Sequence, residues 1–433
     1  MDTTVDKAAF GARRASYSMR ALSSEAKNKA LIRIAEALEM NRDIIEEANI
    51  TDIERSKIEG LAYPLLKRLE FSGVKLDAAI KGIREMAELP DPVGSTTYQC
   101  DLDEGLELYR VTCPLGVIGV IFESRPDALV QISALCLKSS NAVILKGGSE
   151  ADNTNKVLTG IISDAACEMD IPNGWITLLR TRSDVGELLK QDRNVDLIIP
   201  RGSNDFVSMI MKNTNIPVLG HADGVCHIYI DKYADPEIAV RVVIDGKTQY
   251  PAVCNAVETV LVHKDAASLV LPLLDKAFNE NNVQVYGCEK TAEKLGCQLV
   301  SDWHTEYLDL KVSLKIVGSI DDATDHINTY GSGHTESIVT NDRRSAEFFM
   351  SVVDSGNVFW NCSTRFSDGY RYGFGAEVGV STSKVHARGP VGLDGLVTYK
   401  YKLFGNGNIV GDYSSGKKDF DHIKGNKACP FDR

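Results

Sequence analysis

The chain has 433 residues, enough for two or three domains with a substantial buried core. Hydrophobic residues make up 43% and charged residues 25%, the profile of a soluble globular protein. The formal net charge of -12 disfavours contact with phosphate backbones and anionic lipids, so we expect no nucleic acid and no membrane as partners.

The chain start and the cysteines indicate a cellular location. The longest apolar runs, such as 117–122, have the length of a strand and not of a membrane span. The first twenty residues lack the apolar core of a signal peptide, and Asp2 and Asp6 argue against a transit peptide. The ten cysteines include no Cys-x-x-Cys pair, so we expect reduced thiols and no metal site. We predict a cytoplasmic protein.

The first ninety residues favour helices. Residues 26–48 and 61–89 carry apolar side chains at three- and four-residue spacing, and Pro90 ends the second pattern. Residues 102–112 then alternate imperfectly between polar and apolar, which predicts one half-exposed strand.

Two series of strands and helices follow. The first has strands at 117–122, 142–145 and 196–199, a helix at 126–139 and another that begins near Asn153. The second has strands at 226–230, 256–262 and 312–317 and helices at 236–244 and 266–279. This order predicts βαβ units with parallel sheets, and two α/β lobes joined near residue 220 are the simplest architecture.

The C-terminal part contains one more strand pattern. Residues 396–411 alternate again, outside the α/β order. We expect this late strand to pair with the isolated strand at 102–112, with a subunit interface as one possible place. The last fifteen residues or so are polar, and we expect them to be frayed.

The usual glycine motifs for nucleotide phosphates are missing. Gly-x-Gly-x-x-Gly does not occur, and Gly246-Lys247-Thr248 resembles the end of a P-loop but has Arg241 at the first glycine position. Lys146 instead follows a buried strand, where open α/β sheets bind ligands. It is either a contact to ribose or phosphate, or a solvated loop lysine. The segment 200–204 occupies the same position after the next strand and offers a helix N-terminus to an anion.

Cys254 is the candidate nucleophile. Pro251 breaks the preceding helix, so Cys254 falls in a constrained turn before the strand 256–262. Backbone amides of such a turn can stabilise a thiolate and a later oxyanion. A buried structural cysteine is the alternative on physical grounds alone.

Three polar segments are candidates for substrate binding. Arg365 stands beside Ser363 and Thr364, and an arginine next to hydroxyls suits bidentate capture of a carboxylate. His334 lies in a glycine-rich segment, and Arg125 follows a buried strand at an expected cleft mouth. The alternatives are a paired structural arginine at 365 and a hydrogen-bonded loop histidine at 334.

These segments together resemble the γ-glutamyl phosphate reductases (glutamate-5-semialdehyde dehydrogenases) of the aldehyde dehydrogenase superfamily. The similar stretches span residues 116 to about 396 in the order of the family. They read FESRPDALVQ, LKGGSEA, IIPRGSN, PVLGHADGVCHIYID, YPAVCNAVETVLVH, HINTYGSGHTESIVT and NCSTRFSDGYRYGFGAEVGVSTSKVHARGPVGLDGL. Several are long and specific, so the resemblance does not depend on a single motif.

The resemblance implies an α/β, aldehyde-dehydrogenase-like fold with two lobes, parallel sheets and a small β oligomerisation flap. The cofactor domain would comprise 1–96 and 114–224, the catalytic domain 225–388, and the oligomerisation strands 97–113 and 389–415, followed by a tail at 416–433. Cys254 and Asn255 would be catalytic. The cofactor NADPH would contact Ser124, Lys146, Ser149, Gly202, Ser203 and Asn204, and the substrate would contact Arg125, His334, Ser363, Thr364 and Arg365.

The implied reaction is the NADPH-dependent reduction of L-glutamyl 5-phosphate to L-glutamate 5-semialdehyde through a cysteine thioester, in proline biosynthesis. Aldehyde-oxidising relatives carry a glutamate base that 219–224 lacks here, which agrees with a reaction that needs no activated water. Ser149 replaces a lysine common in the family, so the choice of NADP over NAD is less certain than the reaction. The alternative is a non-phosphorylating or CoA-acylating aldehyde dehydrogenase.

The resemblance also implies partners. An acyl phosphate is short-lived in water and we expect no kinase domain ahead of residue 1, so a separate glutamate 5-kinase would supply the substrate in a transient complex. We further expect a homodimer or a higher homo-oligomer.

Overall fold

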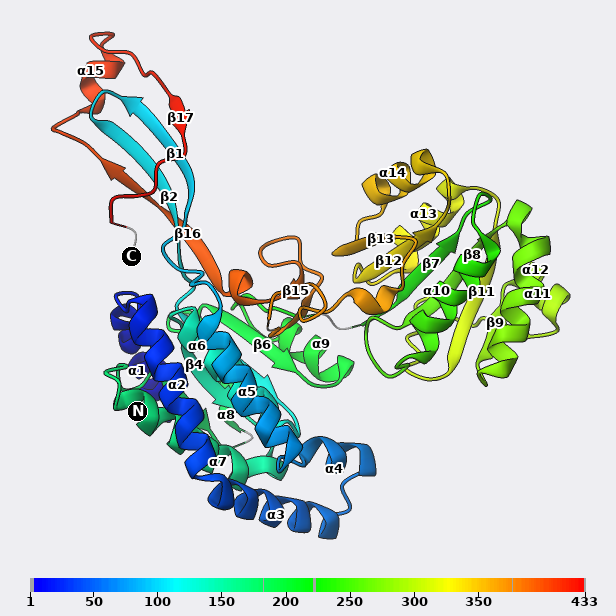
Figure 1. Ribbon diagram of the computed structural model, residues 1–433, viewed down its shortest axis with the longest axis horizontal. Helices are drawn as coiled ribbons and strands as arrows, with labels where there is room; N and C mark the ends of the chain where they lie inside the picture. The colour runs from blue at the N-terminus through cyan, green and yellow to red at the C-terminus, as the bar shows by residue number, and fades with distance from the viewer. Residues whose placement is uncertain (1–3, 182, 221–222, 376, 432–433) are drawn as a thin grey trace. The chain divides into compact units, whose positions relative to one another are not determined.

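The computed structural model describes residues 4–181, 183–220, 223–375 and 377–431. The chain divides into two compact units. The first comprises residues 1–202, 209–218 and 392–433, and the second comprises 203–208 and 219–391. Figure 1 shows the elements of each unit along the chain. The labels cofactor domain and catalytic domain for these parts stay predictions.

The first unit contains a parallel four-stranded sheet of order β5-β4-β3-β6. All six residues of β3 are buried, as expected for a strand covered on both faces. Helix α1 contacts three of these strands, while α2 packs against α5 and α7. The elements of this part are α1 (Thr4–Met19), α2 (Ser24–Met40), α3 (Arg42–Ile58), α4 (Tyr63–Leu69), α5 (Val74–Glu88), β3 (Val117–Phe122), α6 (Pro126–Lys138), β4 (Ala142–Lys146), η1 (Ser149–Ala151), α7 (Asp152–Cys167), β5 (Ile176–Leu179), α8 (Ser183–Leu188) and β6 (Leu197–Arg201). Helix α9 (Asn204–Lys212) is divided between the two units after Ser208.

An antiparallel sheet, which we call the flap, also belongs to the first unit. Its order is β16-β2-β1-β17, and the late strand β16 pairs with β2 within the same chain. The predicted pairing of the two isolated segments is therefore confirmed, without a second subunit. The flap contains β1 (Thr96–Asp103), β2 (Leu106–Pro114), η3 (Leu393–Leu396), β16 (Val397–Phe404), α15 (Val410–Ser414) and β17 (Ile423–Gly425).

The second unit is built around a parallel seven-stranded sheet of order β10-β9-β11-β8-β7-β12-β13. Helices α10 and α11 pack their apolar side chains on one face, and α13 and α14 on the other. The elements are β7 (Cys226–Ile230), α10 (Pro236–Thr248), β8 (Val257–His263), α11 (Lys264–Glu280), β9 (Gln284–Gly287), α12 (Glu289–Leu295), β10 (Gln298–Leu299), β11 (Lys311–Val317), α13 (Ile320–Tyr330), β12 (Thr335–Val339), α14 (Arg343–Val352), β13 (Asn357–Trp360), η2 (Thr364–Phe366), β14 (Gly379–Ser381) and β15 (Gly389–Val391).

The structure confirms the predicted class, an aldehyde-dehydrogenase-like α/β fold, and corrects several elements. The expected single strand at 102–112 is wrong: β1 and β2 form a hairpin, because Gly105 adopts a left-handed φ of 70° and turns the chain. The helical pattern at 26–48 is divided at Asn41, and the pattern at 61–89 is divided at Gly73, where φ is 48°.

One further expectation was wrong, and several strands were not predicted. The tail is not frayed throughout, because β17 pairs with β1 at Gln99, Cys100 and Asp101. In the two parallel sheets, the sequence analysis also missed β5, β9, β10, β12 and β13. In β12 the polar residues Thr335, Glu336 and Ser337 are fully buried, so their polarity concealed a strand of the core.

Within the described residues, no helix is both long and apolar enough to cross a membrane. The same residues contain no group of three His, Cys, Asp or Glu side chains placed to hold a metal ion.

Candidate active site

Cys254 lies in a short turn, which we call the Cys254 loop (residues 249–256), between the end of α10 and the start of β8. Its side chain is half-buried, so the thiol is neither fully exposed nor enclosed in the core. The Cys226 thiol donates a hydrogen bond of 3.1 Å to the main-chain oxygen of Cys254. The first residue of strand β7 therefore holds the Cys254 loop through this hydrogen bond. The prediction that Cys254 lies in a constrained turn before a strand is confirmed.

Gly224 packs directly against the Cys254 loop. A Cβ atom added at Gly224 would lie 2.5 Å from the Cα of Cys254 and 2.7 Å from its Cβ. Real Cβ atoms essentially never approach so closely, and backbone cannot move aside as a flexible side chain can. Only glycine fits here, so the absence of a side chain at 224 sets the position of the thiol.

The buried cysteines contrast with Cys254. Burial raises the pKa of Cys136 and of Cys226, which keeps both thiols protonated at neutral pH. The nearby acidic groups Glu336 and Cys254, in that order, add to the effect on the pKa of Cys226. Cys226 therefore serves as a neutral hydrogen-bond donor. All ten cysteines are free.

A chain of side chains connects the Cys254 loop to the segment 363–367. The Asn255 amide donates to the main-chain oxygen of Ser367 at 2.7 Å, and its Oδ1 atom accepts a hydrogen bond from Arg365. The Arg365 guanidinium also donates to Oε1 of Gln249 at 2.9 Å. Arg365 thus contacts both ends of the loop. Burial lowers the pKa of Arg365, as does Arg371, while Cys254 is among the groups that raise it.

The structure brings most of the predicted substrate residues of the second unit close to this chain. Ser363 is buried and its hydroxyl accepts a hydrogen bond from the backbone N–H of Arg365 at 3.2 Å. Thr364 and His334 have no exposed surface. Nδ1 of His334 lies 2.8 Å from the Thr335 hydroxyl and 3.8 Å from the Cys226 sulfur. His334 thus contacts the cysteine of β7 that supports Cys254, and its side chain has no exposed surface.

Lys247 and Glu258 form a buried ion pair that the sequence analysis missed. The Lys247 ammonium lies 2.7 Å from Oε2 of Glu258, and neither side chain has exposed surface. The pair also binds the main chain of another loop, because Lys247 donates to the oxygen of Asp309 at 3.2 Å and Glu258 accepts from the N–H of Leu308 at 3.3 Å. The sequence did contain one indication of this ion pair. Glu258 interrupts an otherwise apolar strand, and a charged side chain inside a buried strand needs a buried partner of opposite charge.

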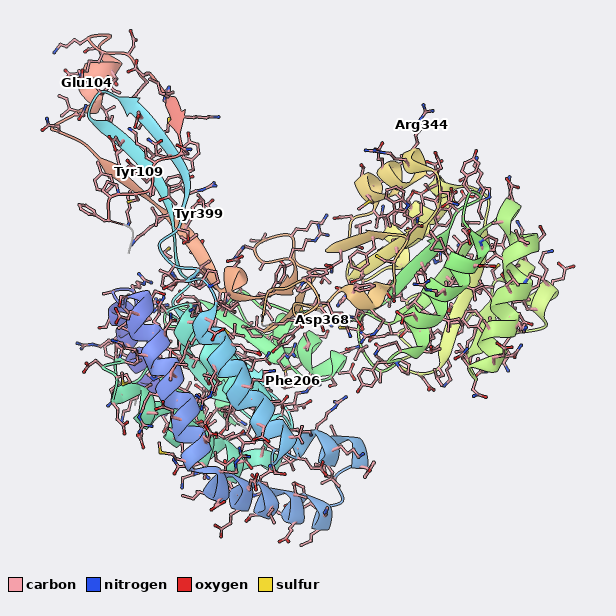
Figure 2. All side chains as sticks on the ribbon, in the orientation of Figure 1. Glu104, Tyr109, Phe206, Arg344, Asp368 and Tyr399 are labelled. Carbon is pink, nitrogen blue, oxygen red and sulfur yellow. The ribbon has the colours of Figure 1, made fainter. Side chains whose placement is uncertain are left out.

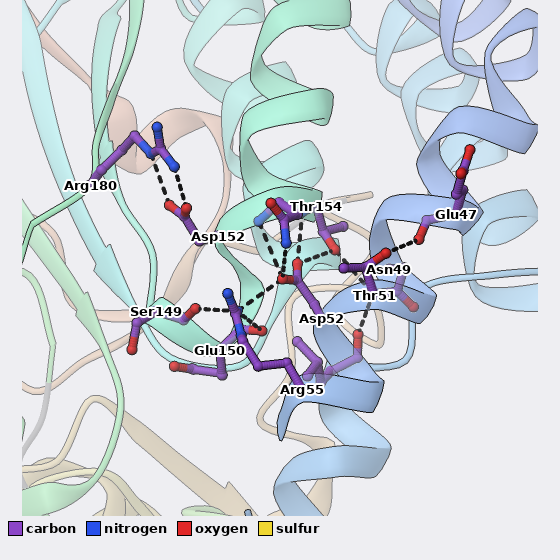
Figure 3. A network of polar contacts seen from close by, with 12 residues as sticks. Glu47, Asn49, Thr51, Asp52, Arg55, Ser149, Glu150, Asp152, Thr154 and Arg180 are labelled. Atoms are coloured by element: carbon purple, nitrogen blue, oxygen red, sulfur yellow. Dashed lines mark hydrogen bonds and ion pairs between the residues drawn. The ribbon is translucent and has the colours of Figure 1, made fainter. Parts of the chain in front are cut away.

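The loop after β4 in the first unit is held by several polar contacts, which Figure 3 shows. Lys146 is buried and its ammonium donates to the oxygen of Gly147. Burial lowers the pKa of Lys146, while Asp184, Glu150 and Asp152 oppose that shift. Lys146 is therefore not the solvated lysine of the alternative interpretation. A Cβ at Gly147 would lie 2.2 Å from the amide nitrogen of Asn155, so the backbone passes close to helix α7.

The other predicted cofactor residues have these places. Ser124 follows β3 with a left-handed φ of 43°, and Ser149 is exposed at the start of η1. Gly202 belongs to the first unit, whereas Ser203 and Asn204 belong to the second. There the Asn204 amide donates to Glu306 and, at 3.2 Å, to Asp223. Arg125, half-buried, precedes α6 in the first unit.

His221 and Ala222, part of the stretch 219–224 where oxidising relatives carry a base, lie outside the described residues.

Comparison with known proteins agrees with this geometry. The model of the aldehyde dehydrogenase family matches residues 2–296. A γ-glutamyl phosphate reductase of Acetivibrio thermocellus is 60% identical over 430 residues, which cover 99% of this chain and 100% of that protein. The enzyme of the same name from Nostoc punctiforme is 51% identical, with 95% of each chain covered.

Solved structures give the same result. The crystal structure of γ-glutamyl phosphate reductase from Thermotoga maritima has a TM-score of 0.92 at 40% identity, and covers 94% of this chain and all of that one. An acetylating aldehyde dehydrogenase from Geobacillus thermoglucosidasius shares the fold at 17% identity, with a TM-score of 0.62 and coverage of 94% and 97%. The chain belongs to the γ-glutamyl phosphate reductases, within the aldehyde dehydrogenase family.

Proposed function

We propose that this enzyme reduces L-glutamyl 5-phosphate to L-glutamate 5-semialdehyde and phosphate with NADPH, as a step of proline biosynthesis. The observation that carries the proposal is the half-buried Cys254 thiol on a loop held by Gly224, Cys226 and Arg365. The membership of the γ-glutamyl phosphate reductases supports the substrate.

Cys254 acts as the nucleophile. Its thiolate attacks the γ-carbonyl carbon, the new carbon–sulfur bond forms, the carbon–oxygen bond to phosphate breaks, and phosphate leaves. When bound, NADPH supplies the hydride that converts the thioester to the aldehyde. Backbone amides of the Cys254 loop support the oxyanion, because the Asn255 side chain is engaged with Ser367 and Arg365. Asn255 contributes by holding Arg365 beside the loop.

Cationic and hydroxyl side chains hold the substrate in this proposal. Arg365 and Ser363 face the anionic groups from the second unit, and Arg125 contributes a further cation. Thr364 and His334 are fully buried. In this proposal they support the segment that carries Ser363 and Arg365 and the strand that holds the Cys254 loop. Asp223 and Gly224 supply no glutamate base next to the thiol, which suits an intermediate that hydrolysis would destroy.

The residues around β4 fit a nicotinamide dinucleotide. The buried ammonium of Lys146, the close backbone approach at Gly147 and the exposed hydroxyl of Ser149 lie at the carboxyl end of a parallel strand, where such cofactors bind. Ser124, Gly202, Ser203 and Asn204 complete the proposed contact set.

The flap is proposed as the contact surface of a homodimer or higher homo-oligomer. The side chains of Tyr399, Tyr401 and Leu403 alternate along β16 and are all more than half exposed. Figure 2 labels Tyr399 on this strand. An exposed apolar edge strand of this kind is a site for pairing with another chain. A transient complex with a glutamate 5-kinase and a cytoplasmic location stay predictions from the sequence.

Measuring phosphate-dependent reduction of NADP⁺ with glutamate semialdehyde tests the function. We expect activity in the wild type and none in Cys254→Ala, while Cys113→Ala, a half-buried cysteine of the flap, retains activity. Full activity of Cys254→Ala would contradict the mechanism. Turnover that ignores phosphate, or that requires CoA, would favour the non-phosphorylating or CoA-acylating alternative.

A further inference from the structure

We propose that Arg371 and Asp368 bind the α-amino acid group of the substrate, Arg371 its carboxylate and Asp368 its ammonium group. This inference rests on the proposed function, because it assigns the part of L-glutamyl 5-phosphate that does not react. Both residues lie outside the substrate contacts of the proposed function. Both belong to the second unit, which also carries Cys254.

The turn that carries both side chains (residues 368–374) is attached directly to the Cys254 loop. The Asn255 amide donates to the main-chain oxygen of Ser367 at 2.7 Å, and Asp368 is the next residue. Figure 2 labels Asp368 on this turn. The reacting carbonyl of the substrate lies at the thiol, and its α-amino acid group lies at the other end of a short carbon chain. Groups that bind it are therefore expected beside the Cys254 loop and not within it.

Arg365 is largely used for holding the Cys254 loop. Its Nε atom donates to Gln249 and its Nη1 atom to Asn255, and only 8% of the residue is exposed. Among the described residues, Nη2 is the guanidinium nitrogen of Arg365 that has no hydrogen-bond partner. One nitrogen suits a single contact to the phosphate, so a second cation must take the carboxylate in a two-pronged contact.

Arg371 has the donors that Arg365 lacks. Its Nη1 atom donates to the main-chain oxygen of Arg365 at 2.7 Å, which fixes the guanidinium beside that residue. The Nε and Nη2 atoms of Arg371 have no hydrogen-bond partner within the part of the chain that the structure describes, and 37% of the side chain is exposed. These two nitrogens share one edge of the guanidinium plane, and such an edge binds a carboxylate through two parallel hydrogen bonds.

Asp368 supplies a negative charge next to these donors. Its Oδ1 atom accepts hydrogen bonds from the N–H groups of Tyr370 and Arg371 at 3.0 and 3.1 Å, which fix the carboxylate on the turn. Its Oδ2 atom lies 3.6 Å from Nη1 of Arg371, too far for a hydrogen bond, and the side chain is 34% exposed. A cation and an anion held side by side in this way match the carboxylate and the ammonium of an α-amino acid.

Main-chain hydrogen bonds hold the turn in shape. The N–H of Tyr372 donates to the oxygen of Asp368 at 2.9 Å, and that of Phe374 donates to the oxygen of Gly369 at 2.8 Å. The Glu377 carboxylate braces the turn as well, because it accepts from the N–H of Gly369 at 2.7 Å. The two charged side chains thus stand on a preformed support, which reduces the cost of ordering them when the substrate binds.

Three aldehydes separate the two contacts. Glutamate 5-semialdehyde carries both groups, 4-aminobutanal lacks the carboxylate, and glutaric semialdehyde lacks the amine. In phosphate-dependent reduction of NADP⁺, we expect the wild type to use each analogue with a kcat/KM about tenfold or more below that of glutamate 5-semialdehyde. Arg371→Gln should lower kcat/KM about 10- to 100-fold for the aldehydes that carry the carboxylate and leave 4-aminobutanal unchanged. Asp368→Asn, which keeps the Oδ1 acceptor of the turn, should affect the aldehydes that carry the amine and leave glutaric semialdehyde unchanged.

Two further variants serve as controls. Arg371→Lys keeps the charge without the planar fork and should retain part of the preference for the carboxylate. Arg343→Gln, at an exposed pair with Glu347 on α14, is the matched control and leaves all three values unchanged. Where the wild type does not turn over an analogue, its inhibition constant against glutamate 5-semialdehyde is measured instead, and the same pattern is expected.

Equal loss with all three aldehydes in Arg371→Gln would overturn the proposal, because Arg371 would then only support Arg365. A raised KM for phosphate in that variant, with the discrimination between aldehydes unchanged, would assign Arg371 to the phosphate and overturn it as well. A wild type without phosphate-dependent activity toward glutamate 5-semialdehyde contradicts the proposed function. An active wild type whose Arg371 and Asp368 variants keep the full discrimination contradicts only this inference.

Discussion

The thiol of Cys226 donates a hydrogen bond to the main-chain oxygen of Cys254 across 3.1 Å. The two cysteines differ: Cys226 is buried, has a raised pKa and serves as a neutral donor, whereas Cys254 is half-buried and is the proposed nucleophile. Gly224 lies two residues before Cys226, and it also packs against Cys254. The segment before β7 therefore determines the position of the proposed nucleophile.

Gly224→Ala tests this positioning. The added methyl would meet the Cα, Cβ and oxygen atoms of Cys254, so the loop must shift. We expect kcat to fall by about 100-fold or more, because a displacement of about 1 Å has that effect on a positioned group. Gly82→Ala is the control, because no atom lies within 4 Å of a Cβ there, and it keeps full activity. Steady-state kinetics decide, and an active Gly224→Ala would contradict the argument.

The ion pair between Lys247 and Glu258 predicts an asymmetry between single and double variants. Lys247→Met leaves the Glu258 carboxylate buried without its partner, which should destabilise the fold by about 3–5 kcal/mol. The double variant Lys247→Met with Glu258→Met removes both charges and should recover most of that loss. Unfolding in urea measures both values. Lys276→Met, in an exposed pair with Glu280, should leave the midpoint unchanged. A double variant as unstable as the single one would contradict the prediction.

His326 predicts a loss of stability in acid. Burial lowers its pKa to about 2, helped by His227 and Lys315, and the Lys315 ammonium donates to its Nδ1 atom at 2.9 Å. The unfolded chain, with a pKa of about 6.5, therefore takes up the proton first. The stability contributed by neutral His326 is complete above pH 6.5 and falls as the pH drops, by up to about 1.4 kcal/mol for each pH unit.

His326→Gln should flatten this dependence between pH 6.5 and 4 when the free energy of unfolding is measured at each pH. His422→Gln, which removes an exposed imidazole of the C-terminal segment, is the control. An equal slope in the wild type and in His326→Gln would show that other groups cause the acid sensitivity.

Arg365→Lys tests the connection between the Cys254 loop and the segment 363–367. Lysine keeps the charge but lacks the planar guanidinium group, whose separate nitrogens donate to Gln249 and Asn255 at the same time. We expect kcat/KM to fall about 10- to 100-fold, as for the loss of hydrogen bonds by a charged group, with an unchanged circular dichroism spectrum. Arg388→Lys, at an exposed pair with Asp354, should keep its activity. Normal activity in Arg365→Lys would assign Arg365 a purely structural role.

Tyr401→Lys together with Leu403→Lys tests the flap as an interface. Two charges on the exposed face of β16 should dissociate the oligomer, which analytical ultracentrifugation detects. Ile58→Lys places the same charge at an exposed residue outside the flap and should not change the mass. A monomeric wild type, or a double variant of unchanged mass, would contradict the proposal.

Some elements could be predicted from the local sequence pattern alone, and others could not. Strand β3 has the predicted bounds, because a run of apolar residues between turn signals needs no distant partner to be recognised. The hairpin of β1 and β2 was missed, because Gly105 was interpreted as part of a single alternating strand. Its left-handed φ instead turns the chain between the two strands. Strand β12 was missed because the polar side chain of Glu336 is satisfied by His227, 109 residues away.

By itself, the sequence determined the α/β class and the family, and it predicted Cys254 as the nucleophile. Each of these follows from local signals: apolar periodicity, the break at Pro251 and long runs of family residues. Only the tertiary structure decided what holds the nucleophile in place. Arg365 meets Asn255 across 110 positions and Gln249 across 116. Such pairs have no spacing that a sequence pattern can reveal, because they form only when separate elements pack together.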